Sequence, residues 1–249
     1  VPSDGLMDIS SELFPVAIKN NEILKAYKSV EYIKDMGTPK RYEEVSSAVN
    51  NNIPSKLSDR SLRKCVFLDR DGVINEEVGH LSNINDFKIL KGVSESIAML
   101  NKLGYLTICV TNQPVIARGD LSFKGLEKIH MKMEAELGKS GAYLDGIYFC
   151  PHHPDKGFSG EITSLKFDCD CRKPKPGLIL EACKDFNIDL VNSWMIGDHA
   201  RDIEAGKLAG TKTIYLGKQG KQNLHENSEP DFVVDSLKDA IKIITAPDC

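Results

Sequence analysis

From residue 64 onward, short apolar segments alternate with amphipathic ones, and this alternation restricts the fold more than any other feature of the sequence. The strand-like segments are 64–69, 105–111, 146–150, 193–198, 212–217 and 231–234. The helix-like segments are 93–103, 121–139, 177–187, 201–209 and 236–245. The strands are almost continuously apolar, as expected when helices cover both faces of a sheet. The pattern predicts an α/β domain with a Rossmann-like open parallel sheet and right-handed crossovers.

The first 50 residues do not follow this alternation. Residues 8–21 have the pattern of a capped helix, residues 23–37 contain strand-like pieces, and residues 38–49 have the pattern of a helix that begins near a proline. The stretch that follows has the composition of a linker. We therefore expect a small α+β appendage at 1–50, a linker at 51–63 and the main domain at 64–249.

Composition excludes several classes of protein. The net charge is −4 and no lysine or arginine stripe is present, which argues against a nucleic acid partner. No apolar run approaches the roughly 18 residues that a membrane-spanning helix needs, so we expect no membrane partner. Three of the seven cysteines lie between residues 150 and 171, near two histidines. This arrangement is typical of a metal site in a reduced, cytoplasmic protein rather than of a disulfide framework.

Polar residues stand where three of the predicted strands end. They are the stretches DRD (69–71), TNQ (111–113) and GD (197–198). In open parallel sheets, ligands bind outside the carboxyl ends of the strands. The sequence therefore predicts one site to which all three stretches contribute.

The pair Asp69 and Asp71 indicates the chemistry of that site. Alternate residues of a strand point the same way, so the two carboxylates would lie side by side and repel each other unless a cation or a proton intervenes. Mg²⁺ suits oxygen ligands and often joins carboxylates to substrate phosphate, and a carboxylate can also act as a nucleophile. The simpler alternative is a pair of solvated acids in a turn.

Three further stretches favour phosphoryl transfer over that alternative. Residues 111–113 offer a hydroxyl and two amides. Arg172 and Lys173 precede a helix whose N-terminus itself favours anions. Asp198 and Asp202 add two more acids. Phosphoryl transfer depends mainly on positioning and on neutralising charge, and this set of residues can do both.

In this order, the motifs D-x-D-G, T-N-Q, R-K-P and G-D-x-x-x-D resemble those of the haloacid dehalogenase (HAD) superfamily of aspartyl-phosphate phosphatases. Within this superfamily, five longer stretches are similar to sequences of the D-glycero-D-manno-heptose 1,7-bisphosphate 7-phosphatase family. They are LDRDGVIN, GHLSNINDFKIL, TNQPVIARG, LDGIYFCPHHP and CDCRKPKPG. The resemblance covers about residues 65–217. It implies a HAD fold and Mg²⁺-dependent hydrolysis of the 7-phosphate of this phosphorylated sugar, in the biosynthesis of nucleotide-activated heptose. Only 39 residues separate Asp71 from Thr111 and 60 separate Thr111 from Arg172, which leaves no room for a large cap domain.

The resemblance also implies roles for individual residues. Asp69 would be the nucleophile and Asp71 the acid–base, while Thr111 and Lys173 would stabilise the transferring phosphoryl group. The Mg²⁺ ligands would be the carboxylate of Asp69, the backbone carbonyl of Asp71 and Asp198. Substrate contacts are implied at Glu77, Val78, Gly79, His80, Asn112, Gln113, Pro114, Arg172 and His199.

A second cluster has the spacing C-x-H-x16-C-x-C, formed by Cys150, His152, Cys169 and Cys171. Thiolates and imidazole at such spacing are typical of a closed, structural Zn²⁺ site. His153 is the alternative ligand to His152, although the family pattern favours the first histidine. The alternative to a zinc site as a whole is a group of buried thiols that bind no metal. Because the loop leads directly into the Arg-Lys pair, we expect zinc to order those two cations.

Two features bear on the substrate. Arg118 offers a bidentate partner for the second phosphate of a sugar bisphosphate, and the alternative is an ordinary surface cation. The chain also departs from the family pattern. It has Pro114-Val115 where the family usually has Ser-Gly, and His199 where relatives usually have lysine or arginine, so these contacts can differ from those of the family.

Two alternative functions remain open at this level. Histidinol-phosphate phosphatases share the zinc loop and the catalytic motifs, so they are the enzymatic alternative. A catalytically silent, zinc-stabilised binding module is the alternative from a different class. The complete set of Asp69, Asp71, Lys173 and Asp198 argues against the silent module, because a protein without activity has no use for both strand-end acids.

Residues 32–45, YIKDMGTPKRYEEV, resemble the carboxyl-terminal end of sugar-phosphate nucleotidyltransferases. We therefore hypothesise that the chain is fused upstream to a nucleotidyltransferase domain of the same pathway. The alternative is a helical appendage that only packs on the phosphatase. No transferase activity is expected from this chain alone, because the glycine-rich nucleotide-binding start of such enzymes is absent.

Overall fold

The central element of the fold is a six-stranded parallel sheet with the order β3-β2-β1-β4-β5-β6. The computed structural model describes residues 8–25, 31–58, 61–157, 159–217, 224 and 229–246. The strands are β1 (Cys65–Leu68), β2 (Leu106–Asn112), β3 (Gly146–Cys150), β4 (Trp194–Gly197), β5 (Lys212–Leu216) and β6 (Phe232–Val234). Each boundary lies within one residue of the predicted one, so the α/β class and the open parallel sheet are confirmed.

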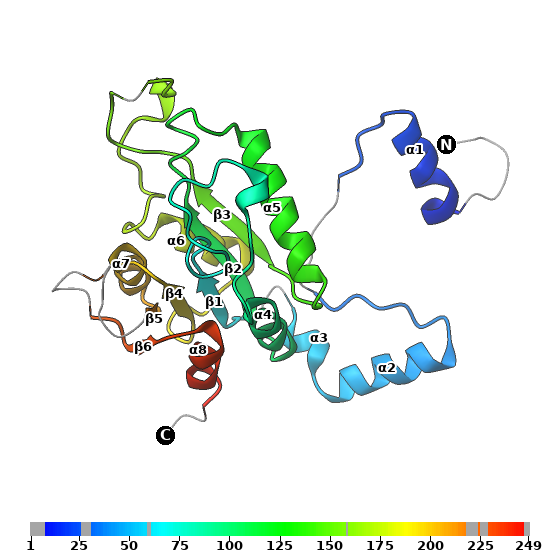
Figure 1. Cartoon of the computed structure of the whole chain (residues 1–249). Helices are drawn as coiled ribbons and strands as arrows, with labels where there is room; N and C mark the ends of the chain where they lie inside the picture. Colours follow the sequence, from blue (N-terminus) through cyan, green and yellow to red (C-terminus); the bar gives the residue numbers. More distant parts are fainter. Residues whose placement is uncertain are drawn as a thin grey trace.

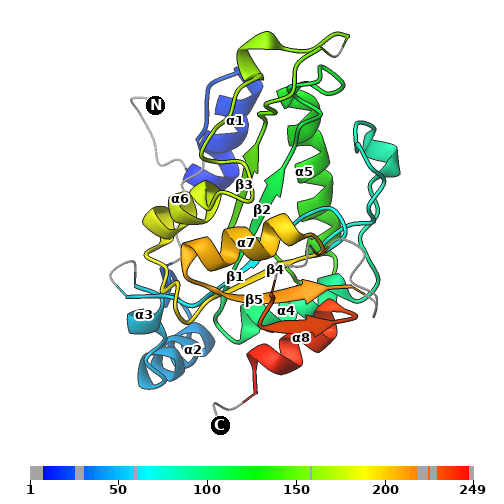
Figure 2. The ribbon, with the colours of Figure 1, turned by 90° about the vertical axis from the view of Figure 1, so that its left-hand side faces the viewer.

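Helices cover both faces of the sheet (Figures 1 and 2). One face carries α4 (Val93–Lys102), α5 (Phe123–Gly138) and α8 (Leu237–Ile244), and the other carries α6 (Gly177–Phe186) and α7 (Ala200–Ala209). Strand β1 shows why its sequence is apolar throughout. Val66 and Leu68 pack in the first layer, Cys65 and Phe67 pack in the second, and all four side chains are fully buried.

The sheet order places the predicted site at a topological switch point. The chain leaves β1 toward β2 on one side and later returns to β4 on the other, so the connections that follow β1 and β4 diverge above the centre of the sheet. Two long excursions rise at this edge, one after β1 and one after β3. They contain the short 3-10 helices η2 (Ile84–Asp86) and η3 (Thr163–Leu165), and neither forms a separate domain in its described residues.

The appendage contains the π-helix η1 (Ile9–Leu13) and the helices α1 (Phe14–Lys19), α2 (Pro39–Asn50) and α3 (Ile53–Lys56). The predicted capping is present: Asp8 accepts hydrogen bonds from the backbone N–H groups of Ser10 and Ser11, and Thr38 accepts one from Arg41. Beside the sheet domain, α1 and α2 bury little of their surface (Figure 1), and Ala48 is the one buried residue recorded on them.

One expectation for the appendage needs correction. The strand-like segment 23–37 contains no strand over residues 23–25 and 31–37, and residues 26–30 lie outside the described chain. A strand is stable only beside a hydrogen-bonding neighbour, and none pairs with these described residues. The predicted linker also contains α3, and its Arg63 bridges to Ile188 of the main domain. None of the described helices combines the length and apolar character needed to cross a membrane.

Candidate active site

The buried Asp69 directly follows strand β1. Its backbone N–H donates to the Ile196 carbonyl of β4 (3.0 Å), so the residue continues the ladder and is held by the sheet. Gly72 follows with φ +78°, a conformation that glycine adopts without strain. A Cβ atom at Gly72 would collide with the carboxylate of Asp198. Glycine therefore allows the loop after β1 to lie directly against the acid that follows β4.

Lys173 joins two carboxylates at the floor of the site. Its Nζ lies 2.9 Å from Asp69 Oδ1 and 2.7 Å from Asp202 Oδ1, and it donates to the Val110 carbonyl at 2.7 Å. Burial alone would lower the pKa of Lys173, but Asp202 and Asp69 outweigh it and raise that pKa. Burial raises the pKa of Asp69, Asp202 adds to the rise, and the Lys173 ammonium opposes it. The lysine is therefore firmly protonated and supplies positive charge beside Asp69.

Asn112 fixes the backbone of Lys173. Its Oδ1 accepts a hydrogen bond from the Lys173 N–H and its Nδ2 donates to the Lys173 carbonyl, each at 3.0 Å. The predicted substrate contact at Asn112 thus has a structural role that the sequence did not reveal. Thr111, one residue earlier on β2, is buried and accepts a hydrogen bond from Gln113 at 2.9 Å.

Asp71 is held by three side chains. Arg70 Nη2 donates to both of its oxygens (2.9 and 3.0 Å), Gln113 Nε2 donates to Oδ2 (2.9 Å), and Asn75 Nδ2 donates to Oδ1 (2.9 Å). Burial favours a higher pKa for Asp71, but the charge of Arg70 and these hydrogen bonds outweigh it and hold the pKa below its usual value. Asp71 is therefore ionised in this arrangement.

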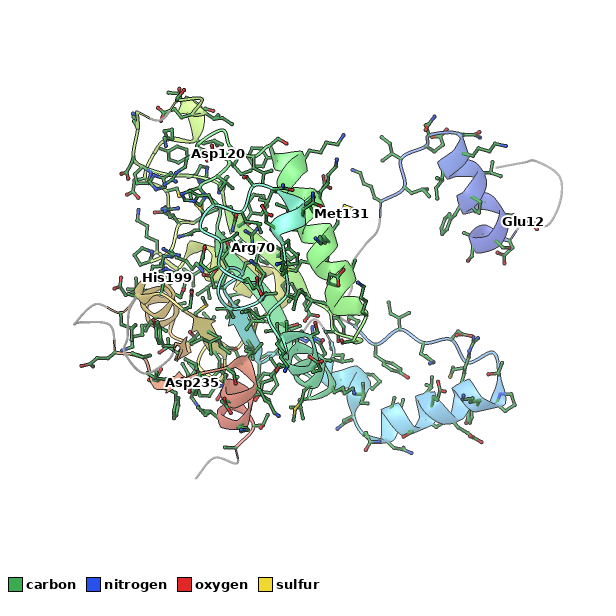
Figure 3. The ribbon with its side chains drawn as sticks, viewed as in Figure 1. Glu12, Arg70, Asp120, Met131, His199 and Asp235 are labelled. Carbon is green, nitrogen blue, oxygen red and sulfur yellow. The ribbon has the colours of Figure 1, made fainter. Side chains whose placement is uncertain are left out.

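Arg70 is a site residue that the sequence reasoning missed. It is fully buried, and besides Asp71 it donates to Gln113 Oε1 (3.0 Å) and contacts His130 Nε2 of α5 (3.4 Å). Figure 3 shows Arg70 in the interior, near α5. A signal existed, because alternation on the strand turns Arg70 away from Asp69 and toward a packed layer. A charge placed there needs partners of its own.

These residues border a cleft of about 360 Å³ at the carboxyl edge of the sheet. Of the predicted residues, its lining includes Asp69, Asp71, Glu77, Gly79, His80, Thr111, Asn112, Gln113, Pro114, Arg118, Arg172 and His199. Lys173 is not among the lining residues and is buried. Val78 is 46% exposed and is not among them either, so the contact implied there is not brought into the cleft.

The lining also includes Arg201, which no motif singled out, and His153, which the sequence offered only as an alternative zinc ligand. At the rim, Arg118 contacts His80 across the cleft mouth, so two predicted substrate contacts meet. A larger cavity, of about 1050 Å³, lies at the opposite edge of the sheet, between the appendage and residues 101–106. It holds none of the predicted site residues.

His199 does not extend freely into the cleft. Its Nδ1 lies 2.7 Å from Asp198 Oδ1, and its backbone N–H donates to Asp202 Oδ2 at 3.1 Å, which caps the start of α7. The hydrogen bond to Asp198 is the main reason that the pKa of His199 is raised. Nδ1 of the ring is thus already engaged by a carboxylate.

The carboxylates fit a divalent cation. Asp69, Asp71, Asp198 and Asp202 carry four negative charges, and Arg70 and Lys173 return two positive ones, so a charge of −2 is left for a cation before His199 is counted. The oxygen donors suit a hard ion such as Mg²⁺. Ligand atoms of Asp198, His199 and Asp202 lie within 4.8 Å of one another. Both oxygens of Asp202 are engaged, Oδ1 by Lys173 and Oδ2 by the His199 N–H, whereas Lys173 and the Arg70 N–H both contact Oδ1 of Asp69. Asp69 and Asp198 are therefore the better candidates for ligands.

The cysteine loop brings its four predicted ligands together. The ligand atoms of Cys150, His152, Cys169 and Cys171 all lie within 4.8 Å of one another, and this cluster could hold a metal ion. Individual separations are 3.3–3.7 Å, close to those between ligands of a tetrahedral ion bound at about 2.0–2.3 Å. His153 lies outside the cluster, and its Nδ1 accepts a hydrogen bond from the Asp155 N–H (3.1 Å).

Known proteins share this fold. The HAD-hydrolase-like family model matches residues 170–240. The solved structure of the D,D-heptose 1.7-bisphosphate phosphatase from B. bronchiseptica, complexed with magnesium and phosphate, superposes with a TM-score of 0.64 and 30% identity. The match covers 73% of this chain and 97% of that chain. A heptose bisphosphate phosphatase from Burkholderia thailandensis gives a TM-score of 0.53 at 28% identity, covering 74% of this chain and 99% of that one. Fold and site together define a phosphatase of the HAD type.

Relatives in sequence narrow the class. The D-glycero-beta-D-manno-heptose-1,7-bisphosphate 7-phosphatase of Vibrio cholerae is 43% identical over 179 residues, which cover 71% of this chain and 94% of the relative. The protein of the same name from Escherichia coli K12 is 38% identical over 175 residues, 70% of this chain and 90% of the relative. This chain belongs to the D-glycero-beta-D-manno-heptose-1,7-bisphosphate 7-phosphatase family, whose members are phosphoric monoester hydrolases. These matches leave more than a quarter of the chain without a counterpart and lend no support to the nucleotidyltransferase fusion.

Proposed function

We propose that this protein removes the 7-phosphate of D-glycero-D-manno-heptose 1,7-bisphosphate through an aspartyl-phosphate intermediate. The observation that carries the proposal is the buried Lys173, held between Asp202 and Asp69, of which Asp69 lines the cleft. A lone lysine bridging two acids inside a protein costs desolvation free energy. The arrangement is useful when a further anion, the phosphoryl group, binds beside the lysine.

In the first half of the reaction, a carboxylate oxygen of Asp69 attacks the phosphorus. The bond between phosphorus and the sugar oxygen breaks, and Asp71 gives that oxygen a proton. Lys173, which lies 2.9 Å from Asp69, and the Thr111 hydroxyl, which lines the same cleft as Asp69, stabilise the oxygens of the transferring group. When bound by Asp69, the Asp71 carbonyl and Asp198, Mg²⁺ supplies further neutralisation of negative charge.

Asp71 needs a proton for this step, although its resting surroundings keep it ionised. An entering phosphate dianion places negative charge beside Asp71, and a like charge raises the pKa of a carboxyl group. Arg70, Gln113 and Asn75 keep its oxygens oriented meanwhile. In the second half, Asp71 takes a proton from water, the water oxygen attacks the phosphorus, and the Asp69 carboxylate is released.

We further propose that the cluster of Cys150, His152, Cys169 and Cys171 binds structural Zn²⁺. The four nitrogen and sulfur donors lie within reach of one ion and leave no position for substrate. Arg172 Nη1 donates to the His152 carbonyl (3.2 Å), so a hydrogen bond connects the cysteine loop to a residue that lines the cleft. Metal bound there would restrict the backbone that carries Arg172 and Lys173.

The arginines of the cleft favour a sugar bisphosphate over histidinol phosphate. Arg118, Arg172 and Arg201 all line it. A second phosphate gains from these cations, whereas the ammonium group of histidinol phosphate is repelled by them. The cleft therefore supports the heptose reaction over its enzymatic alternative.

Mg²⁺-dependent phosphate release tests the proposal. The panel contains both anomers of heptose 1,7-bisphosphate, heptose 7-phosphate and histidinol phosphate. We expect the bisphosphate to give the highest kcat/KM. Release from histidinol phosphate but not from the bisphosphate would refute the substrate assignment. No release from any of them, with the fold and the thiol metal intact, would favour the silent binding module.

Two further expectations accompany this proposal. A cytoplasmic location suits the free thiols of the cysteine cluster, since that compartment keeps them reduced. The fusion of residues 1–50 to a nucleotidyltransferase stays a hypothesis that rests on their sequence alone. A protein extended upstream, if it forms a sugar nucleotide from heptose 1-phosphate, would support it, and an inactive extended protein would oppose it.

A further inference from the structure

The first turn of α7 brings to the cleft a cation that no motif singled out. Arg201 lines the cleft and is half-buried. Its Nε atom is buried and makes no hydrogen bond within the described structure. A buried donor without an acceptor is unfavourable in a folded protein, so this N–H group is in a position to bind an acceptor that a ligand supplies.

A second guanidinium group lies near it. Arg172 lines the same cleft, and one of its nitrogens, Nη1, donates to the His152 carbonyl. Arg172 and Arg201 thus place two like charges on the lining of one cleft of about 360 Å³. Two like charges at one wall of a cleft are stabilised by an anion that contacts both.

The neighbouring residue on the same turn does not fill this role. His199 also lines the cleft, but its Nδ1 is hydrogen-bonded to Asp198 and its backbone caps α7. Arg201 lies two residues further along the helix and keeps its guanidinium donors for a ligand. A guanidinium fork matches the oxygens of a phosphate and can bind two of them at once.

We propose that Arg201, together with Arg172, forms the subsite for the phosphate that is not transferred, and that Arg201 is a specificity-determining residue for a bisphosphorylated substrate. This inference rests on the proposed function. It also moves the second phosphate away from Arg118, which contacts His80 at the rim. Arg201 binds substrate here and takes no part in the bond-breaking step.

Equilibrium binding tests the subsite without turnover. Calorimetry on an Asp69→Asn background compares heptose 1,7-bisphosphate with heptose 7-phosphate, which lacks the second phosphate. We expect this parent to prefer the bisphosphate at least tenfold. Arg201→Gln should reduce the affinity for the bisphosphate at least tenfold more than that for the 7-phosphate. Arg201→Lys should restore part of the preference, because it keeps the charge but loses the fork.

Two matched variants serve as comparisons. Lys207→Gln removes an exposed cation from the same helix and should leave the preference unchanged. Arg118→Gln tests the competing position. The inference would be overturned if Arg201→Gln lost the same affinity for both ligands. It would also be overturned if the preference for the bisphosphate disappeared only in Arg118→Gln, or if the Asp69→Asn parent showed no such preference.

Turnover separates this inference from the proposed function. A wild-type enzyme that hydrolyses the bisphosphate, paired with an Arg201→Gln variant that keeps the full binding preference, overturns the subsite alone. A wild-type enzyme that releases no phosphate from the bisphosphate overturns the proposed function. The binding preference of the Asp69→Asn protein then still decides whether Arg201 recognises a second phosphate.

Discussion

The carboxylate cluster at the strand ends and the thiol cluster in the loop after β3 are assembled in opposite ways. The thiol ligands come from the 22 residues between Cys150 and Cys171. The carboxylate site draws on residues from Asp69 to Asp202, which follow separate strands of the sheet. A short loop can form the first cluster almost by itself, whereas the second exists only when the sheet has formed.

The two clusters also differ in how their charge is balanced. Within the carboxylate site, Arg70 pairs with Asp71, and Lys173 pairs with Asp69 and Asp202. Among the described residues, no lysine or arginine side chain pairs with the thiols in this way, and Arg172 donates to a backbone carbonyl instead. Loss of Mg²⁺ should therefore leave the carboxylate site folded but inactive. Loss of Zn²⁺ should destabilise the cysteine loop itself.

The largest expected effect is on chemistry alone. Asp69→Asn keeps the shape of the side chain but replaces the carboxylate with an amide that cannot attack phosphorus. We expect phosphate release to fall by about 10³-fold or more. Circular dichroism and the thiol-bound metal content should match the wild type. Turnover within tenfold of wild type would contradict Asp69 as the nucleophile.

Adjacent histidines offer a matched pair for the thiol cluster. His152→Gln removes a predicted ligand, and we expect the loss of one metal equivalent and a fall in Tm of at least about 5 °C, because metal binding contributes to folding free energy. His153→Gln should keep the metal, since His153 lies outside the cluster. Elemental analysis and thermal melting measure both. Equal metal loss in the two variants would show that the assignment of His152 is wrong.

A smaller effect on turnover is expected from Arg70→Lys. The substitution keeps a positive charge but loses the fork that contacts both oxygens of Asp71, so we expect kcat to fall by about 10- to 100-fold with little change in KM. The concentration of folded enzyme is measured by active-site titration with vanadate, so that loss of stability is not mistaken for loss of rate. An unchanged kcat per folded molecule would remove Arg70 from the positioning of Asp71.

The smallest effect concerns stability against pH. Burial, aided by Arg70, lowers the pKa of His130 to about 4. Between pH 4 and 6.5, His130 is neutral in the folded protein but charged in the unfolded chain, whose histidine has the ordinary pKa of about 6.5. Its contribution to the free energy of unfolding is therefore complete above pH 6.5 and is lost as the pH falls toward 4. The lost contribution is about 1–3 kcal/mol. His130→Gln should reduce the fall of Tm between pH 6.5 and 4. An equal fall of Tm in the variant and the wild type would contradict this role of His130 in the pH dependence of stability.

Much of the fold could be predicted because its signals are local. The six strands are short, continuously apolar runs, and the helices between them have a clear apolar face, so most boundaries agree with the structure to within two residues. The segment 23–37 shows the limit of this reasoning. Its composition favours strands, but a strand needs a neighbour, and the chain supplies none for the described part of that segment.

The site was predicted only in part, for a related reason. Motif residues such as Asp69 and Lys173 stand out by type and spacing. Arg70, His130 and Arg201 do not, because their importance depends on which residues they contact. Arg70 and His130 are 60 positions apart in the chain, yet their side chains lie 3.4 Å from each other. No periodicity in a sequence encodes such a contact.

The sequence by itself determined the order of strands and helices, the chemical types at the strand ends and the four candidate metal ligands of the cysteine loop. Each of these follows from neighbouring residues along the chain. Only the tertiary structure decided that Lys173 lies between Asp69 and Asp202, that Asp71 is held by Arg70, and that Arg201 faces the cleft where His199 is bound to Asp198. The physical reason is that the sheet order brings distant segments to one edge, and electrostatic pairing inside the protein depends on distance in space.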